Sequence, residues 1–303
     1  MSSQPTQEEA PKDTAQLLKD AIATLSSLTN SATSTSTSTN RGTSKVTHIA
    51  EKIIQGSKQV QHDAQKLDDY VYDTWCGIFD LVGKTTSEHQ QPIINLLLEL
   101  RKTTLCPNDD SSKEPVTVQS AGTLWSDLPT FGWVARDLWN FDASDKTASQ
   151  SDRQKWTNYA AFLAKLTAIS LSDKEGNDAL DFSTFALWSL REAFETSSSE
   201  EANSTAVKLA SLWIKHAGKE LKLATEKQVS LPQAQGRGGG EFSERGWTGF
   251  NDERWAVWKG GFRAFAEKDG GAPGEGVAAG SGGTGDGEID EVREMAREAA
   301  GLM

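Results

Sequence analysis

Two tryptophan–arginine pairs have the spacing that most suggests binding chemistry. Trp133 and Arg136 form one pair, Trp188 and Arg191 form the other, and Trp139 follows shortly after the first. On a helix, residues three apart share a face, so each guanidinium can stack on its neighbouring ring and line a groove for a ligand. The competing interpretation is that these rings fill space between helices and that each arginine pairs with the adjacent acid. The five residues are therefore candidates for a ligand groove, with core packing as the alternative.

Two glycine motifs resemble nucleotide-binding loops without meeting their requirements. The segment from Gly77 to Thr85 has five residues between its glycines, where the phosphate-binding loop needs four, and it lies on a helical apolar stripe. The segment from Gly280 to Gly285 has the dinucleotide spacing, but no strand precedes it and no helix directly follows it. We therefore expect no nucleotide cofactor.

Residues suited to metal binding or nucleophilic catalysis are scattered along the chain. The four histidines form no metal-binding motif, and Cys76 and Cys106 are thirty residues apart. Cys76 follows Trp75 on an expected helix, which is typical of a small buried hydrophobic residue. No GxSxG motif is present, and the paired carboxylates are adjacent in sequence and point apart. The sequence predicts no catalytic residue, no metal site and no cofactor, so an enzyme is the less favoured class.

Charge and hydropathy limit the possible partners. The formal net charge is −12, which disfavours free nucleic acid as a partner because phosphate binding needs local positive charge. We expect no membrane partner, because the N-terminus lacks the features of a signal peptide and no apolar run is long enough to span a bilayer. With only two cysteines, the chain is expected to be soluble and intracellular, in either cytoplasm or nucleus.

Composition divides the chain into a helical centre and two biased ends. Residues 1–44 are expected to be mostly disordered and Ser/Thr-rich, with one short amphipathic helix at Thr14–Leu28. Residues 45–268 have the length of one large domain or two small ones, and we favour one. Residues 269–303 combine a glycine-rich tether with a short acidic helix. On this division, deletion of 269–303 is expected to leave the melting temperature within a few degrees.

Apolar spacing predicts helices through the centre, separated by a long loop at 107–128, in which Val116 and Val118 could form a very short strand, and by a loop at 228–250. Steps of three, four and seven residues run through 46–82, as one long helix or as two helices broken near Gly56. Pro92 suits the first turn of the next helix, which should end before Cys106 because proline follows there. Further helices are expected at 133–141, from about 151, at 181–194 as the middle of the core, at 207–221 and at 255–265. The expected fold is all-α, a single irregular multi-helix domain with flexible low-complexity ends.

Five segments together resemble an uncharacterised fungal family, DUF3632, a domain of unknown function. Their order and spacing are similar to those of the family and cover about half of the chain: LWSDLPTFGWVARDLWN (124–140), WTNYAAFLAKLT (156–167), FALWSLREAFE (185–195), LASLWIKHAGKEL (209–221) and ERWAVWKGGF (253–262). The first 44 residues and the glycine-rich tail lie outside the resemblance. It implies an intracellular, all-helical ascomycete protein, and it brings no assigned activity, cofactor or site residue.

Two functional hypotheses follow from these observations. The first is a non-catalytic intracellular interaction or scaffold protein, whose helical core and terminal helices bind a protein partner of unknown identity. The second is an orphan enzyme or small-molecule carrier with a pocket between helices at the five tryptophan and arginine residues named above. The first is preferred because the motifs of known catalytic mechanisms are missing.

Overall fold

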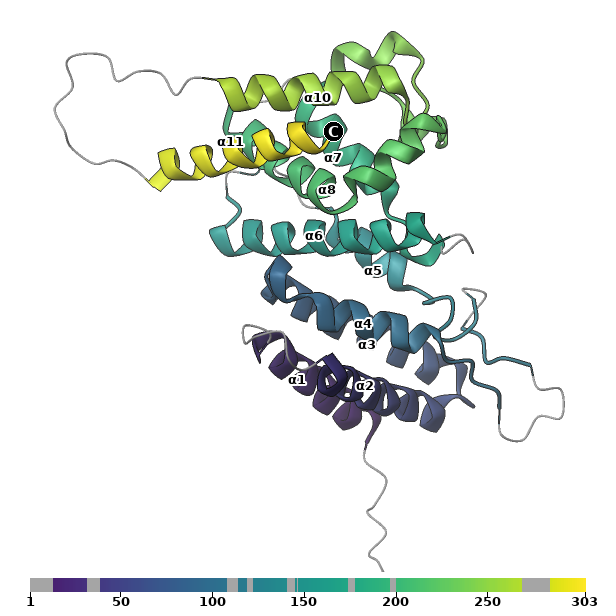
Figure 1. The fold of residues 1–303 in the computed structure, drawn as a ribbon. Coiled ribbons are helices and arrows are strands. Elements are labelled where there is room, and N and C mark those ends of the chain that lie inside the picture. Colours follow the sequence, from purple (N-terminus) through teal and green to yellow (C-terminus); the bar gives the residue numbers. More distant parts are fainter. Residues whose placement is uncertain are drawn as a thin grey trace, which may run out of the picture. The chain divides into compact units, whose positions relative to one another are not determined.

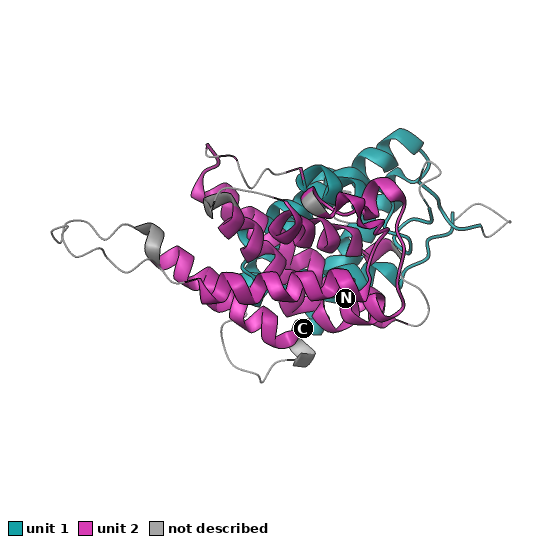
Figure 2. Cartoon of the chain, turned by 90° about the horizontal axis from the view of Figure 1, so that it is seen from above, with its two compact units in different colours: residues 1–139 teal, residues 140–303 magenta. Residues whose placement is uncertain are grey.

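The chain folds into helices arranged in two compact units. The computed structural model describes residues 13–31, 39–107, 114–118, 122–140, 145, 147–173, 178–196, 200–268 and 284–303. Over these residues the structure is helical, with β-structure limited to two isolated bridges, which confirms the all-α fold class (Figure 1). Unit 1 comprises residues 1–139 and unit 2 residues 140–303 (Figure 2). The predicted domain boundaries after residues 44 and 268 stay a prediction, and most of the two expected low-complexity segments lies outside the described residues.

Unit 1 is built from three long helices, with shorter helices packed against them. Its elements are α1 (Thr14–Ser31), α2 (Thr39–Val60), α3 (Ala64–Lys84), the 3-10 helix η1 (Ser87–His89), α4 (Gln91–Arg101) and α5 (Phe131–Leu138). The helix α1 contacts α2, α3 and α4, and it buries Leu17, Ala21 and Leu25 against them. The amphipathic N-terminal helix is therefore part of the core of unit 1. The helix α2 begins at Thr39, inside the Ser/Thr-rich segment 1–44 that was expected to be mostly disordered.

The break between α2 and α3 falls at residues 61–63 and not at Gly56. Asp63 caps α3, because its carboxylate accepts a hydrogen bond from the Lys66 amide at 3.2 Å. Gly56 has a different role: a Cβ at this position would collide with the hydroxyl of Tyr70, which donates to the Ile53 carbonyl at 2.9 Å. This burial raises the pKa of Tyr70. The glycine lets α2 and α3 pack closely.

Unit 2 is organised around its longest helix. Its elements are α6 (Gln150–Ser172), η2 (Asp178–Leu180), α7 (Ser183–Glu195), α8 (Glu200–Glu226), α9 (Gln233–Gly236), η3 (Gly240–Arg245), α10 (Asp252–Glu267) and α11 (Thr284–Leu302). The helix α8 contacts α6, α7, α10 and α11, and its residues Val207, Ala210 and Trp213 are fully buried. The middle of the unit 2 core is therefore α8, although the apolar pattern favoured α7 for that place.

Side-chain contacts fix the directions of these helices. Arg153 of α6 bonds Thr205 of α8 near both helix starts, and Ser172 bonds Glu220 near both ends, so the two helices run in the same direction. Ion pairs Lys208–Glu291 and Lys215–Glu298 place α11 parallel to α8 in the same way. The helices α6, α8 and α11 consequently begin at the same end of unit 2.

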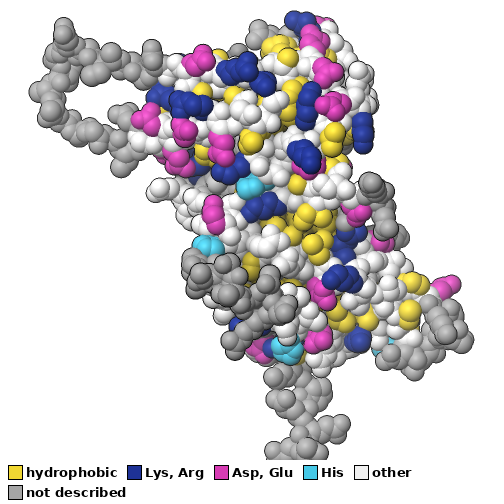
Figure 3. Space-filling model, in the orientation of Figure 1, with side chains coloured by type: hydrophobic (Ala, Val, Ile, Leu, Met, Phe, Trp, Pro, Cys, Tyr) yellow, Lys and Arg dark blue, Asp and Glu magenta, His cyan; other side chains and the backbone are white. Residues whose placement is uncertain are grey.

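The C-terminal helix α11 packs on α8 and α10. Its stripe of Val292, Ala296 and Ala299 is at most 1% exposed. The outward sides of α10 and α11 carry basic and acidic side chains next to one another (Figure 3). Because its apolar stripe is buried, this helix packs as part of unit 2, and we expect its removal to be destabilising, in contrast to the sequence-based prediction.

Candidate functional site

The loop that precedes α5 in unit 1 has an unusual backbone. Trp125, Leu128 and Thr130 have φ values of 68°, 48° and 64°, in the left-handed region that residues with a Cβ seldom adopt. Each such residue costs on the order of 1–3 kcal/mol and persists only where its surroundings determine it. Trp125 is fully buried and Leu128 is 2% exposed, so the packing around these side chains holds the backbone in this conformation.

Hydrogen bonds to neutral groups hold this loop against the helices of unit 1. The Trp125 indole N–H donates to the Ser57 hydroxyl at 3.2 Å, and the Trp75 indole N–H donates to the Pro129 carbonyl at 2.7 Å. Arg101 Nε donates to the Ser126 carbonyl at 3.1 Å. The loop therefore positions α5 and its side chains as a fixed element.

The helices α5 and α3 present an exposed aromatic surface in unit 1. Trp133 is 65% exposed and Tyr72 is 49% exposed, and Asp137 acts electrostatically on Tyr72. Because Trp133 and Asp137 are four residues apart on α5, they share one face of that helix. We call these two exposed sites, Trp133 with Asp137 on α5 and Tyr72 with Asp73 on α3, which the charge of Asp137 links, the aromatic face.

Cys76 lies beside this aromatic face and is half-buried. The Tyr72 hydroxyl is hydrogen-bonded to its sulfur, which raises the pKa of Tyr72. Burial, together with the negative charges of Asp73 and Asp137, raises the pKa of the Cys76 thiol. A protonated thiol is a poor nucleophile, so Cys76 has the character of a packing residue, as its position next to Trp75 suggests.

The five predicted groove residues fall into two groups, one in each unit. In unit 1, Trp133 and Arg136 are exposed on α5, and Trp139 follows that helix half-buried. In unit 2, Trp188 and Arg191 of α7 both donate to the Gln235 carbonyl, at 3.1 and 3.4 Å. The structure therefore brings Trp188 and Arg191 together at one backbone carbonyl, and a common groove of all five stays a prediction.

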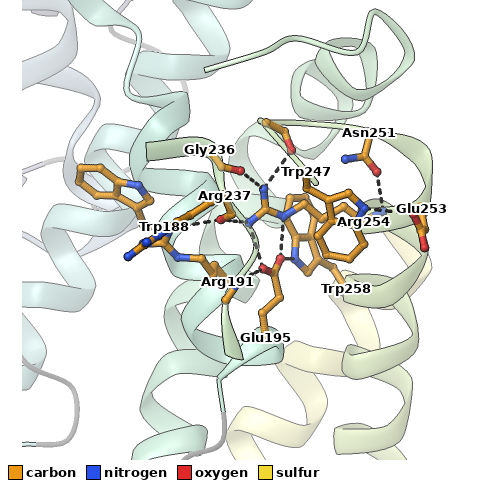
Figure 4. Close-up of polar contacts among 12 residues, drawn as sticks. Trp188, Arg191, Glu195, Gly236, Arg237, Trp247, Asn251, Glu253, Arg254 and Trp258 are labelled. Atoms are coloured by element: carbon orange, nitrogen blue, oxygen red, sulfur yellow. Dashed lines mark hydrogen bonds and ion pairs between the residues drawn. The ribbon is translucent and has the colours of Figure 1, made fainter. Parts of the chain in front are cut away.

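A buried ion pair that sequence reasoning missed lies beside Trp188 and Arg191 (Figure 4). Glu195 of α7 and Arg254 of α10 have side chains that are 0% exposed. Arg254 Nε and Nη2 donate to the two carboxylate oxygens at 2.7 and 3.0 Å. Glu195 also accepts from the Trp258 indole at 2.7 Å and the Gly239 amide at 2.8 Å.

The remaining donors of Arg254 hold the loop between α8 and α10. Nη1 donates to the carbonyls of Gly236 and Gly249 at 2.6 and 3.0 Å, and Nη2 donates to that of Arg237 at 3.1 Å. All five guanidinium N–H groups thus have acceptors. A Cβ on Gly240, whose φ is 48°, would collide with the Glu195 carbonyl, so glycine is required where this loop passes α7. We call this network, centred on Glu195 and Arg254, the buried latch.

The arrangement of the buried latch suits a structural role, because it joins α7, α10 and the loop before α10. A charge pair removed from water is tolerated only with nearly every hydrogen bond made, and here both partners are satisfied. Burial, together with the positive charge of Arg254, lowers the pKa of Arg191, which is near the same carboxylate. A sequence signal was present. Glu195 continues the Trp188–Arg191 face of α7 by one turn, and Arg254 lies next to Trp255 at the start of an apolar helical stripe.

A cavity of about 620 Å³ lies in unit 2 at the end where α6, α8 and α11 begin. None of the five predicted groove residues lines it. Its walls carry two cations, two carboxylates and several hydroxyl and amide groups, including Arg153, Thr157, Thr205, Lys208 and Glu291. The volume suits a small-molecule ligand, and the polar walls suit a polar one.

In the described part of the chain, no three His, Cys, Asp or Glu side chains are grouped so that they could hold a metal ion. None of the helices in this part has both the length and the apolar character needed to cross a bilayer.

Comparisons with known proteins identify a family without naming an activity. No curated protein and no solved structure matches the chain. One family model, described as a protein of unknown function, matches residues 75–262, which include the loop before α5, the buried latch and α6 to α8. Because this match covers more than half of the sequence, the chain belongs to the DUF3632 family of proteins of unknown function.

Proposed function

We propose that the chain is a non-catalytic intracellular interaction protein, and that the aromatic face of unit 1 binds a basic segment of a protein partner. The observation that carries this proposal is the exposure of Trp133, at 65%, in a motif where Trp125 is fully buried. Tryptophan is enriched at the energetic centres of protein interfaces, because a large ring excludes water from the bonds around it.

The chemistry around Trp133 favours a cationic partner. Tyr72 supplies a second exposed ring, and Asp73 and Asp137 both place negative charge near it. A lysine or arginine side chain can lie over either ring and pair with either carboxylate. The strained loop fixes α5 in place before binding, which reduces the entropy lost when a partner is ordered against it.

An intracellular location agrees with the cysteine chemistry. Both cysteines are free thiols, and thiols persist in reducing compartments. This part of the proposal is tested by localising the tagged full chain in its own host cells.

The binding proposal is tested with an array of peptides of varied charge and the full chain. We expect arginine- and lysine-containing peptides to bind. Trp133→Ala should weaken the best of them at least about tenfold, the size expected for loss of an interface hot spot. Trp133→Phe should retain part of the affinity because it keeps an aromatic ring, and Asp137→Asn should weaken basic peptides selectively.

Leu223→Ala in unit 2 is the matched control, because Leu223 is also a large exposed apolar residue, at 44%. It should leave peptide affinity unchanged. Equal binding by wild type and Trp133→Ala, or no binding by any basic peptide, would exclude the aromatic face as the binding surface.

A further inference from the structure

The cavity of unit 2 is lined by an arginine whose donors are only partly used. Arg153 is half-buried on α6, and its guanidinium donates to two neutral acceptors, the Thr205 hydroxyl at 3.3 Å and the Asp145 carbonyl at 3.0 Å. The Asp145 carboxylate is also near it: hydrogen bonds from Thr147, and then the charge of Arg153, lower the pKa of Asp145. A guanidinium has five N–H donors in a planar fork that matches a carboxylate or phosphate. Arg153 therefore keeps donors for a group that enters the cavity.

A second cation lies on the neighbouring wall. Lys208 of α8 has a side chain only 20% exposed, and its ammonium is 3.5 Å from a Glu291 oxygen. Glu291 is 62% exposed, so water competes for it and the ion pair contributes little. An anion in the cavity would give Lys208 a better-shielded partner.

The start of α6 adds to this positive character. Gln150 and Arg153 line the cavity from the first turn of α6, whereas α8 and α11 line it only from Ser204 and Gly287 onward. The positive end of the α6 dipole therefore lies at the cavity and stabilises negative charge near that first turn. The opposite wall carries Glu288 and Glu291 on α11, which suit an amine or hydroxyl group of the same ligand.

We propose that this cavity is a binding site for a small polar metabolite that carries a carboxylate or phosphate group, held by Arg153 and Lys208. The hydroxyls of Thr157 and Thr205 and the carboxylates of Glu288 and Glu291 bind the polar remainder of the molecule. The site lies in unit 2 and is independent of the aromatic face in unit 1, so either proposal can fail without the other.

Titrations of the full chain at low ionic strength test the site and distinguish the two anions. Inorganic phosphate is followed by ³¹P NMR, and succinate is followed by saturation-transfer ¹H NMR. We expect at least one of them to bind. Arg153→Gln should weaken that binding at least about tenfold, because it removes the charge-assisted hydrogen bonds to the anion. The probe that binds more tightly identifies the anionic group.

Lys208→Gln should weaken binding, and Lys215→Gln is its matched control. Lys215 lies two turns further along α8, pairs with Glu298 of α11 and does not line the cavity. Glu288→Gln, an exposed substitution, should strengthen the binding of phosphate and succinate, because neither probe has an amine for this carboxylate and the change removes a like charge. The proposal is overturned if neither probe binds, if Arg153→Gln binds like wild type, or if Lys215→Gln weakens binding as much as Lys208→Gln.

Discussion

Both units secure an irregular loop immediately before a helix, but they use different chemistry to do it. In unit 1, the loop before α5 is held by two indole N–H groups that donate to the neutral oxygens of Ser57 and Pro129. A part-buried guanidinium, that of Arg101, also donates to the Ser126 carbonyl, and in the described part of unit 1 no carboxylate is buried beside it. In unit 2, the loop before α10 is held by a buried guanidinium that donates to three backbone carbonyls and to Glu195. Both loops lie within the residues that match the family.

The two arrangements differ in the free-energy cost of losing one hydrogen-bonding partner. A neutral donor leaves one unsatisfied acceptor behind, which costs about 1–3 kcal/mol. A buried ion pair that loses one partner leaves an uncompensated charge, which costs about 3–5 kcal/mol. We call the side chains that hold each loop its anchor. Unit 2 should therefore be more sensitive than unit 1 to a single substitution in its anchor. This holds although fewer non-glycine residues of its loop have a left-handed backbone.

The largest expected effect is that of Arg254→Met. It leaves Glu195 charged and buried and removes the donors to the carbonyls of Gly236, Arg237 and Gly249. We expect the free energy of unfolding to fall by about 3–5 kcal/mol. Chemical denaturation measures this loss, and hydrogen exchange should localise faster opening to residues 235–250.

Two further variants decide whether the unpaired buried charge of Glu195 causes the loss of stability. Arg263→Met changes an exposed arginine on the same helix and should alter stability by less than about 0.5 kcal/mol. The double variant Glu195→Met with Arg254→Met removes both charges and should recover much of the loss. A single Arg254→Met variant as stable as wild type would remove the proposed difference between the two anchors.

Deletion of residues 284–303 is expected to have the next largest effect. The deletion exposes the faces of α8 and α10 that cover Val292, Ala296 and Ala299, which should cost roughly 3 kcal/mol. Thermal unfolding monitored by circular dichroism measures the change. If the melting temperature instead stays within a few degrees, unit 2 would depend on its latch and not on α11.

A point substitution separates burial from the length of the deletion. Val292→Asp places a charge in the buried stripe of α11 and should reproduce most of the loss. Glu294→Gln, on the outward side of the same helix, should be nearly neutral.

The helices themselves were predictable from the sequence because their physical cause is periodic. The apolar stripe from Leu17 to Leu25 predicted α1, and Pro92 marked the start of α4. The stripe in α8 is as clear in the structure as in the sequence. These features depend only on residues within one helix, where spacing decides which side chains share a face.

The anchors were not predictable because they depend on residues far apart in the chain. Glu195 and Arg254 are 59 residues apart, and a helical pattern does not show which loop a buried charge will bond. Trp125 and Trp133 lie in one motif, yet one is fully buried and the other is 65% exposed. The left-handed residues between them set this difference, and no glycine marked those positions.

The smallest expected effect is that of Trp125→Phe, which tests the neutral anchor of unit 1. Phenylalanine keeps an aromatic ring in the contact with Trp75, whose ring centroid lies 5.6 Å away, but it lacks the N–H that bonds Ser57. The expected loss in chemical denaturation is about 1–3 kcal/mol. Trp133→Phe makes the same chemical change at an exposed position and should be neutral for stability within about 0.5 kcal/mol. A loss at Trp125 as large as that at Arg254 would mean that strain in the loop, and not the charge of its anchor, determines how much each unit depends on its loop.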